Sequence, residues 1–172
     1  MSKRRNSNGT ATVELPFVLW FFFFLVVFPM LDMATAGIRI TILYAAAHTA
    51  AISASRAHTF LAPLEEKKSA IQLAQQRTVD VVSSFTGVKV SKIETSIIIT
   101  NLETLTESKT NAPLTKTADV SKNTYQIEVI IEGTTAPLIA VPLPVRIDGV
   151  THPLSVKMSD RQYCENPQGL TI

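Results

Sequence analysis

A long apolar stretch near the N-terminus constrains this chain more than any other feature of its sequence. Between Leu15 and Leu31 no residue is charged, polar or glycine, and only Pro16 and Pro29 disfavour a regular helix. With residues 33–37 added, the stretch reaches the roughly 20 residues that a helix needs to cross about 30 Å of hydrocarbon. We therefore predict a transmembrane helix over residues 10–37.

The charges before this helix predict its orientation. Residues 1–9 form a short leader that carries Lys3, Arg4 and Arg5. Basic residues that flank a transmembrane helix stay on the cytoplasmic side, so these three act as a topology signal. The N-terminus is then cytoplasmic, and residues 38–172 form an extracytoplasmic domain of ordinary size.

Glu14 stands directly before the apolar run. A carboxylate costs about 2.5–3.5 kcal/mol at the centre of a bilayer and less near its surface, so an acid in this place is a functional candidate that needs a cationic partner. In a second interpretation, Glu14 lies in the headgroup layer at a helix N-terminus, where the helix dipole favours a negative charge. The residues alone leave both interpretations open.

Several segments resemble a known protein family. Gly9 and Glu14 form the pattern G-x-x-x-x-E after a basic leader, which is similar to the class III signal of prepilins. The segment T-A-T-V-E-L-P-F-V-L-W resembles the corresponding segment of the TadE-like pseudopilins of tight-adherence (Tad, or Flp) pilus systems. The alanine-rich segment 44–56 and the late segments P-L-I-A-V-P-L-P and L-S-V-K-M-S are also similar to that family, whereas Leu15 and Pro16 depart from its common pattern.

This resemblance implies a function in assembly. A prepilin peptidase in the membrane would cut between Gly9 and Thr10, and Glu14 would meet the N-terminal ammonium of a neighbouring subunit. The chain would then be a pilin-like minor pseudopilin of the inner membrane that helps to assemble a bacterial pilus used for surface adhesion or secretion. Its partners would be membrane lipid, the prepilin peptidase, other pilins and pilus assembly proteins.

Two other interpretations of the N-terminal segment stay open. Ala34, Thr35 and Ala36 form an A-x-A pattern, after which a signal peptidase could cut and release a secreted soluble protein. The apolar core is longer than the about 7–15 residues usual in a signal peptide. Alternatively, the chain is a conventional single-pass protein that is not processed at Gly9 and binds a partner through its extracytoplasmic domain.

The residues after the apolar stretch predict two helices. The first helix continues over residues 38–60 as an exposed spine rich in alanine. On this spine we expect four charged or titratable side chains to face water or acids: Arg39, His48, Arg56 and His58. A second helix begins at Pro63, which suits a first turn, and ends before Gly87. Its predicted buried face consists of Ile71, Ala74, Thr78, Val81, Val82 and Phe85.

Further along, the apolar period changes to two, which predicts strands over residues 93–100, 125–132 and 154–159. The polar segment 102–123 predicts a long loop with a little strand at its start. Together these elements give an α+β fold, in which a small antiparallel sheet of three or four strands packs one face on the helices, as in a pilin.

The C-terminal third carries three more local signals. Three prolines exclude residues 137–144 from a central strand. Asp148 and Gly149 predict a hairpin turn that joins a strand at 145–147 to the residues after Val150. The polar tail from Asp160 is expected to be loose.

The composition favours neither an enzyme nor a nucleic-acid-binding protein. The net charge is +2, and outside the leader the basic residues are scattered. We predict no cofactor, metal or small-molecule substrate, because the sequence has no Cys/His cluster, no glycine-rich phosphate loop and no nucleophile–histidine arrangement. Cys164 is the single cysteine, so an intrachain disulfide is impossible and the state of its thiol stays open.

Overall fold

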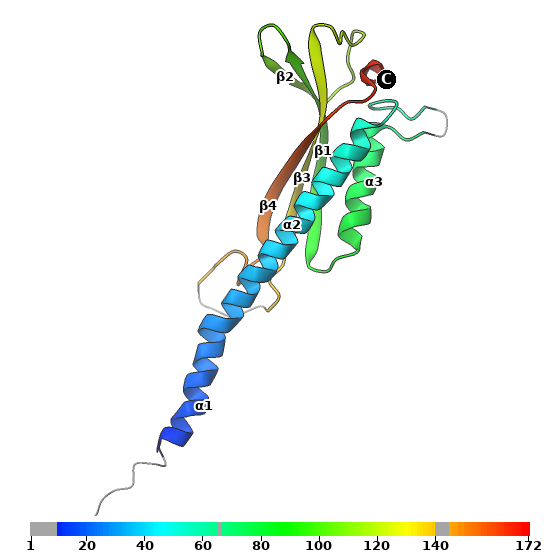
Figure 1. Ribbon diagram of the computed structural model, residues 1–172. Coiled ribbons are helices and arrows are strands. Elements are labelled where there is room, and N and C mark those ends of the chain that lie inside the picture. The colour runs from blue at the N-terminus through cyan, green and yellow to red at the C-terminus, as the bar shows by residue number, and fades with distance from the viewer. Residues whose placement is uncertain (1–9, 65–66, 140–144) are drawn as a thin grey trace, which may run out of the picture.

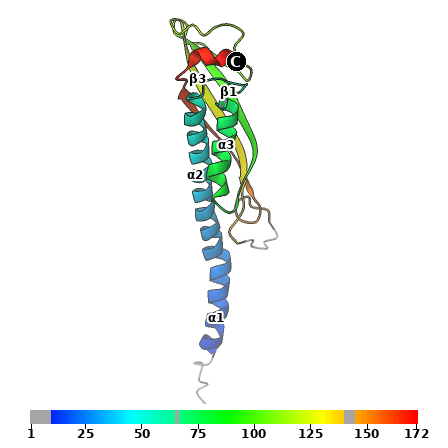
Figure 2. The ribbon, with the colours of Figure 1, turned by 90° about the vertical axis from the view of Figure 1, so that its right-hand side faces the viewer.

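The computed structural model describes residues 10–64, 67–139 and 145–172, with side chains from Glu14 onwards within these ranges. The chain forms a long N-terminal helical rod, a second helix and a four-stranded antiparallel sheet, which confirms the predicted α+β fold (Figure 1). The C-terminal half of the rod lies against the sheet and the second helix, whereas the N-terminal half projects from this body (Figure 2).

The rod consists of α1 (Thr10–Phe22), the π-helical turn η2 (Phe23–Val27) and α2 (Phe28–Ser55). Proline explains the local change of register, because Pro29 lacks an N–H and its ring crowds the carbonyl group of Leu25, four residues earlier. A π turn relieves this crowding, and the Phe28 N–H accordingly donates to Phe23 O, five residues back. At 1.5 Å per residue the whole rod is about 70 Å long.

The rod ends earlier than the sequence predicted. Its last helical residue is Ser55, and Arg56 follows as the C-cap, so the helix does not continue to Phe60. The side chain of Phe60 is fully buried in the core, and its N–H donates to the carbonyl oxygen of Ile172 at 2.9 Å rather than to a helical partner. Tertiary packing therefore overrides the local helix preference of residues 56–60.

The second helix, α3 (Ala70–Ser83), begins at Ala70 and not at Pro63. Ser69 caps it, because its hydroxyl accepts the Gln72 N–H at 3.3 Å while the Gln72 amide oxygen accepts the Ser69 N–H at 3.3 Å. This S-x-x-Q capping box is visible in the sequence and is a stronger start signal than the proline. The predicted buried face is confirmed at three positions: Ala74, Thr78 and Val82.

The sheet contains β1 (Val88–Asn101), β2 (Glu107–Thr110), β3 (Asn123–Thr135) and β4 (Leu154–Tyr163) in the order β2-β1-β3-β4. All three predicted strands are confirmed and are longer than predicted, and β2 lies inside the polar segment 102–123. Alternation directs Ile97, Ile127 and Val129 towards the helices, where each is fully buried.

Two predictions for the C-terminal third are wrong. Residues 145–147 form no strand, although Gly149 does occupy a turn with φ +90°. The tail is ordered, because η3 (Pro167–Thr171) follows β4 and the Ile172 carbonyl accepts the Phe60 N–H at 2.9 Å. Leu170 explains this docking, since its side chain closes one end of the core at 3% exposure. Residues 137–139 lie outside the sheet, and 140–144 lie outside the described residues.

Small residues determine how closely α2 approaches the sheet and α3. Five alanines on one face of α2 are at most 1% exposed: Ala46, Ala47, Ala50, Ala51 and Ala54. The approach is equally close at Gly133 on β3, where an added Cβ would lie 2.8 Å from Lys89 O and 3.1 Å from Leu43 Cδ2. The core therefore has no room for larger side chains along this contact.

A larger side chain on the buried alanine face should destabilise the body. We expect Ala47→Leu to lower the free energy of unfolding by about 1–3 kcal/mol, because overpacking forces strained side chains and backbone shifts. Ala45→Leu, on the exposed side of the same helix, should change it by less than about 0.5 kcal/mol. Urea unfolding of the full-length protein in detergent measures both values, and equal effects of the two variants would contradict this packing.

Candidate functional site

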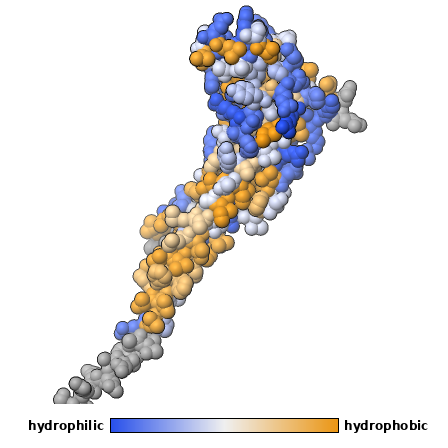
Figure 3. Space-filling view, viewed as in Figure 1, coloured by the Kyte–Doolittle hydropathy of each residue, from blue (hydrophilic) through white to orange (hydrophobic). Residues whose placement is uncertain are grey.

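The projecting part of the rod exposes apolar side chains around its whole circumference. Leu15, Phe17 and Trp20 are 59%, 69% and 59% exposed, and the neighbouring phenylalanines are exposed to a similar degree. Figure 3 shows this apolar surface continuing from the free part of the rod to the body. Among the described residues, this is the one helix long and apolar enough to cross a membrane. The structure is therefore consistent with a single-pass membrane protein.

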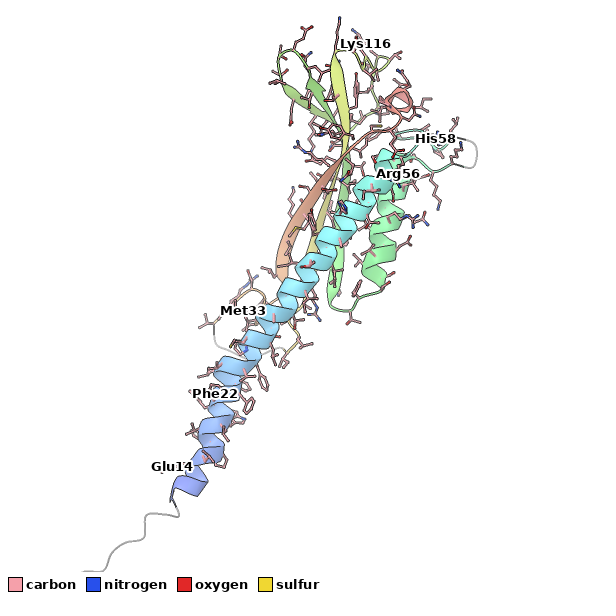
Figure 4. All side chains as sticks on the ribbon, in the orientation of Figure 1. Glu14, Phe22, Met33, Arg56, His58 and Lys116 are labelled. Atoms are coloured by element: carbon pink, nitrogen blue, oxygen red, sulfur yellow. The ribbon has the colours of Figure 1, made fainter. Side chains whose placement is uncertain are left out.

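Glu14 lies near the free end of this apolar rod, where its side chain is exposed (Figure 4). None of the ion pairs between described residues includes it. Placing an unpaired carboxylate in lipid costs free energy, and a cation from another molecule would lower that cost.

The residues of the predicted cleavage site are only partly described. Thr10 is the first residue of α1, and its side chain is not described. Gly9 and the leader residues Lys3, Arg4 and Arg5 lie outside the described residues. Cleavage between Gly9 and Thr10 therefore stays a prediction.

Asp32 is a site residue that the sequence analysis did not single out. Its side chain is fully buried, and its Oδ1 accepts the N–H groups of Leu138 at 2.8 Å and Ile139 at 2.9 Å. Within the described part of the chain, the other carboxylate oxygen has no hydrogen-bond partner. A lone acid near the end of a transmembrane segment was the signal that could have identified it.

Arg39 lies two turns further along the same face of α2 and corrects another expectation. Instead of facing water it is 9% exposed, and its guanidinium donates to the carbonyl oxygen of Ala136. The guanidinium also fills the space over Gly87, where an added Cβ would lie 2.4 Å from Arg39 Cζ. Asp32 and Arg39 thus bind backbone groups of the same loop, residues 136–139.

A polar network covers the sheet face that points away from the helices. Glu128 on β3 accepts hydrogen bonds from Lys109 on β2 and, at 2.9 Å, from Arg161 Nε on β4. The second guanidinium arm of Arg161 lies 3.1 Å from Glu107. Burial opposes ionisation of Glu128, but these cationic donors outweigh it and lower the pKa of its carboxyl group. The network joins the two edge strands to the centre of the sheet.

The described side-chain hydrogen bonds of the histidines join none of them to the cysteine or to another histidine. His48 Nδ1 lies 2.9 Å from Asp160 Oδ2 and so ties α2 to β4, as expected of a histidine that faces an acid. His58 is exposed to water, as predicted, and its Nε2 lies 3.3 Å from Lys67 Nζ. Burial raises the pKa of the Cys164 thiol, which makes it a poor nucleophile at neutral pH. In the described ranges, no three His, Cys, Asp or Glu side chains are grouped so that they could hold a metal ion.

No protein-family model matches this chain, and neither a curated protein nor a solved structure is significantly similar to it.

The Glu128 network should make stability depend on acidity. Because the pKa of Glu128 is lower in the folded chain than in the unfolded chain, its contribution is complete above the unfolded value of about 4.3 and is lost as the pH falls through the folded value. Glu128→Gln should lower stability at pH 7 by about 1.5–3 kcal/mol, the value of hydrogen bonds to a charged group.

The same variant should also show a weaker loss of stability between pH 7 and pH 3 than the unmodified protein. Chemical unfolding at several pH values measures this difference. Glu103→Gln, in an exposed turn, is the matched control and should follow the unmodified protein. Parallel curves for all three proteins would contradict a role for Glu128.

Proposed function

We propose that this protein is a pilin-like subunit of the inner membrane, a TadE-like minor pseudopilin that takes part in the assembly of a Tad-type pilus. Its role is structural. The apolar rod supplies contacts with lipid and with other subunits, and the α+β body supplies the surface by which partners recognise it.

The observation that carries this proposal is the form of the rod. One helix begins as a free apolar rod and continues, without a break, as the central helix of the body's core. An anchor joined to its domain by a flexible linker would not transmit a position in the membrane to the domain, whereas a continuous helix does. A subunit that is drawn from a membrane and stacked in a filament needs such a rigid connection.

The position of Asp32 and Ala36 supports retention of the rod. Cleavage after Ala36 would cut α2 in its interior and remove Asp32, the acceptor for two backbone N–H groups of the body. Ala36 itself is 7% exposed, so a peptidase could reach that bond only before folding. We therefore favour the anchored subunit over a secreted protein that begins at Gly37.

Processing is tested by changing the residue at the predicted cut. We expect the protein purified from membranes of its own cells to lack residues 1–9, and we expect Gly9→Val to keep them, since a prepilin peptidase needs an unhindered backbone at that residue. Intact-mass spectrometry distinguishes this result from loss of Met1 alone and from loss of residues 1–36.

Gly37→Val is the matched control for this experiment. It makes the same substitution where an added side chain meets open space, so the mature mass should change only by that of the substitution. Retention of the leader in the unmodified protein would favour the conventional single-pass protein, and an unchanged mature N-terminus in Gly9→Val would rule out the cut after Gly9.

Glu14 is tested by its effect on assembly. Glu14→Ala should leave the protein in the membrane fraction but strongly reduce its amount in sheared pili, because removing one partner of a buried ion pair costs about 3–5 kcal/mol. Glu103→Ala, which removes an exposed acid from the body, should assemble normally. The pairing hypothesis fails if Glu14→Ala enters pili as efficiently as this control.

A further inference from the structure

The loop between β3 and β4 lies at the end of the body from which the rod projects (Figures 1 and 2). We call its described residues, 136–139 and 145–153, the base loop. Asp32 binds its Leu138 and Ile139 N–H groups, and Arg39 binds its Ala136 carbonyl oxygen. These three backbone contacts fix this part of the loop against α2.

The base loop exposes large apolar side chains. Leu138, Val145 and Ile147 are 55%, 61% and 44% exposed, and Arg146 beside them is exposed as well. Single exposed apolar residues are ordinary on soluble proteins, whereas this loop exposes three of them next to an apolar helix. On the rod, Met33 is 68% exposed and lies level with the loop (Figure 4).

If the rod spans a bilayer, its length brings this loop to the membrane surface. From Leu15 to Leu31 the apolar residues span only about 25 Å at 1.5 Å per residue, whereas the hydrocarbon is about 30 Å thick. If Leu15 lies at the cytoplasmic boundary of the hydrocarbon, Asp32 and the turn that follows it lie just inside the opposite boundary. Asp32 is tolerable at this depth because the base loop covers it and supplies two hydrogen bonds.

We propose that the base loop is a second membrane contact, which lies in the interfacial layer with Leu138, Val145 and Ile147 against lipid acyl chains. The inference rests on the proposed membrane anchoring by the rod. Its chemistry suits an interface, since apolar side chains flanked by an arginine are typical of segments at the boundary between hydrocarbon and headgroups.

Two contacts with one bilayer restrict the orientation of the body more than a single transmembrane helix does. A lone transmembrane helix can tilt and rotate about its axis, and its domain would follow. The base loop lies on one side of the rod. Its insertion therefore favours the rotation of the protein about the rod axis that brings the base loop to the membrane surface. The body would then present one defined face to neighbouring subunits before assembly.

Three exposed valines allow a matched test on the full-length protein. Val18 in α1, Val145 in the base loop and Val120 at the opposite end of the body are 61%, 61% and 59% exposed. Each is changed to cysteine in a Cys164→Ser background, labelled with bimane and reconstituted in vesicles of phosphatidylethanolamine and phosphatidylglycerol. Lipids brominated along their acyl chains then quench any label that contacts hydrocarbon, and equal unfolding midpoints verify that the variants fold.

We expect quenching and a blue-shifted emission for Val18→Cys and Val145→Cys, and neither for Val120→Cys. If Val18→Cys is quenched while Val145→Cys behaves as Val120→Cys does, the base-loop contact is overturned and the membrane anchor stands. If Val145→Cys is blue-shifted but not quenched by brominated lipid, protein covers the loop, and the lipid contact is overturned too. Absence of quenching at Val18→Cys would overturn the proposed anchoring together with this inference.

Discussion

The structure depends on one helix that meets two different surroundings. In its first part the rod carries Phe, Leu, Val and Trp side chains on every side, which suits contact with lipid. In its second part it carries alanines such as Ala47 and Ala50, which let the backbone approach the sheet and α3 closely. The same helical backbone thus presents large apolar side chains in its first part and packs through small side chains in its second part.

Charged groups along this helix are tolerated where backbone groups bind them. Asp32 and Arg39 lie on one face, two turns apart, and they bind N–H and carbonyl groups of one loop. A buried ion costs several kcal/mol unless hydrogen bonds compensate it, so the backbone groups of this loop make the burial of both charges tolerable. Specific polar contacts therefore hold the body to the rod near the point where the core ends.

The sequence predicted an element correctly where one local pattern controlled the structure of that element. The period-two alternation of β1 and β3 and the length of the apolar rod both predicted elements that the structure contains. Predictions were wrong where distant residues decided the outcome: Phe60 turns into the core, and Leu170 draws the tail onto it. The start of α3 is different, because the capping box at Ser69 is a local pattern in the sequence and is a stronger start signal than Pro63.

The candidate site was predictable only in part, for a physical reason. Glu14 is recognisable because an acid beside a long apolar run is costly wherever the run lies. The role of Asp32 depends on a loop more than a hundred residues away, and no local pattern indicates that backbone N–H groups of that loop will reach it. The two acids nevertheless obey one rule: each lies near one end of the apolar run, where the cost of a charge is lowest. Asp32 accepts its hydrogen bonds from its own chain, whereas none of the ion pairs between described residues includes the exposed carboxylate of Glu14.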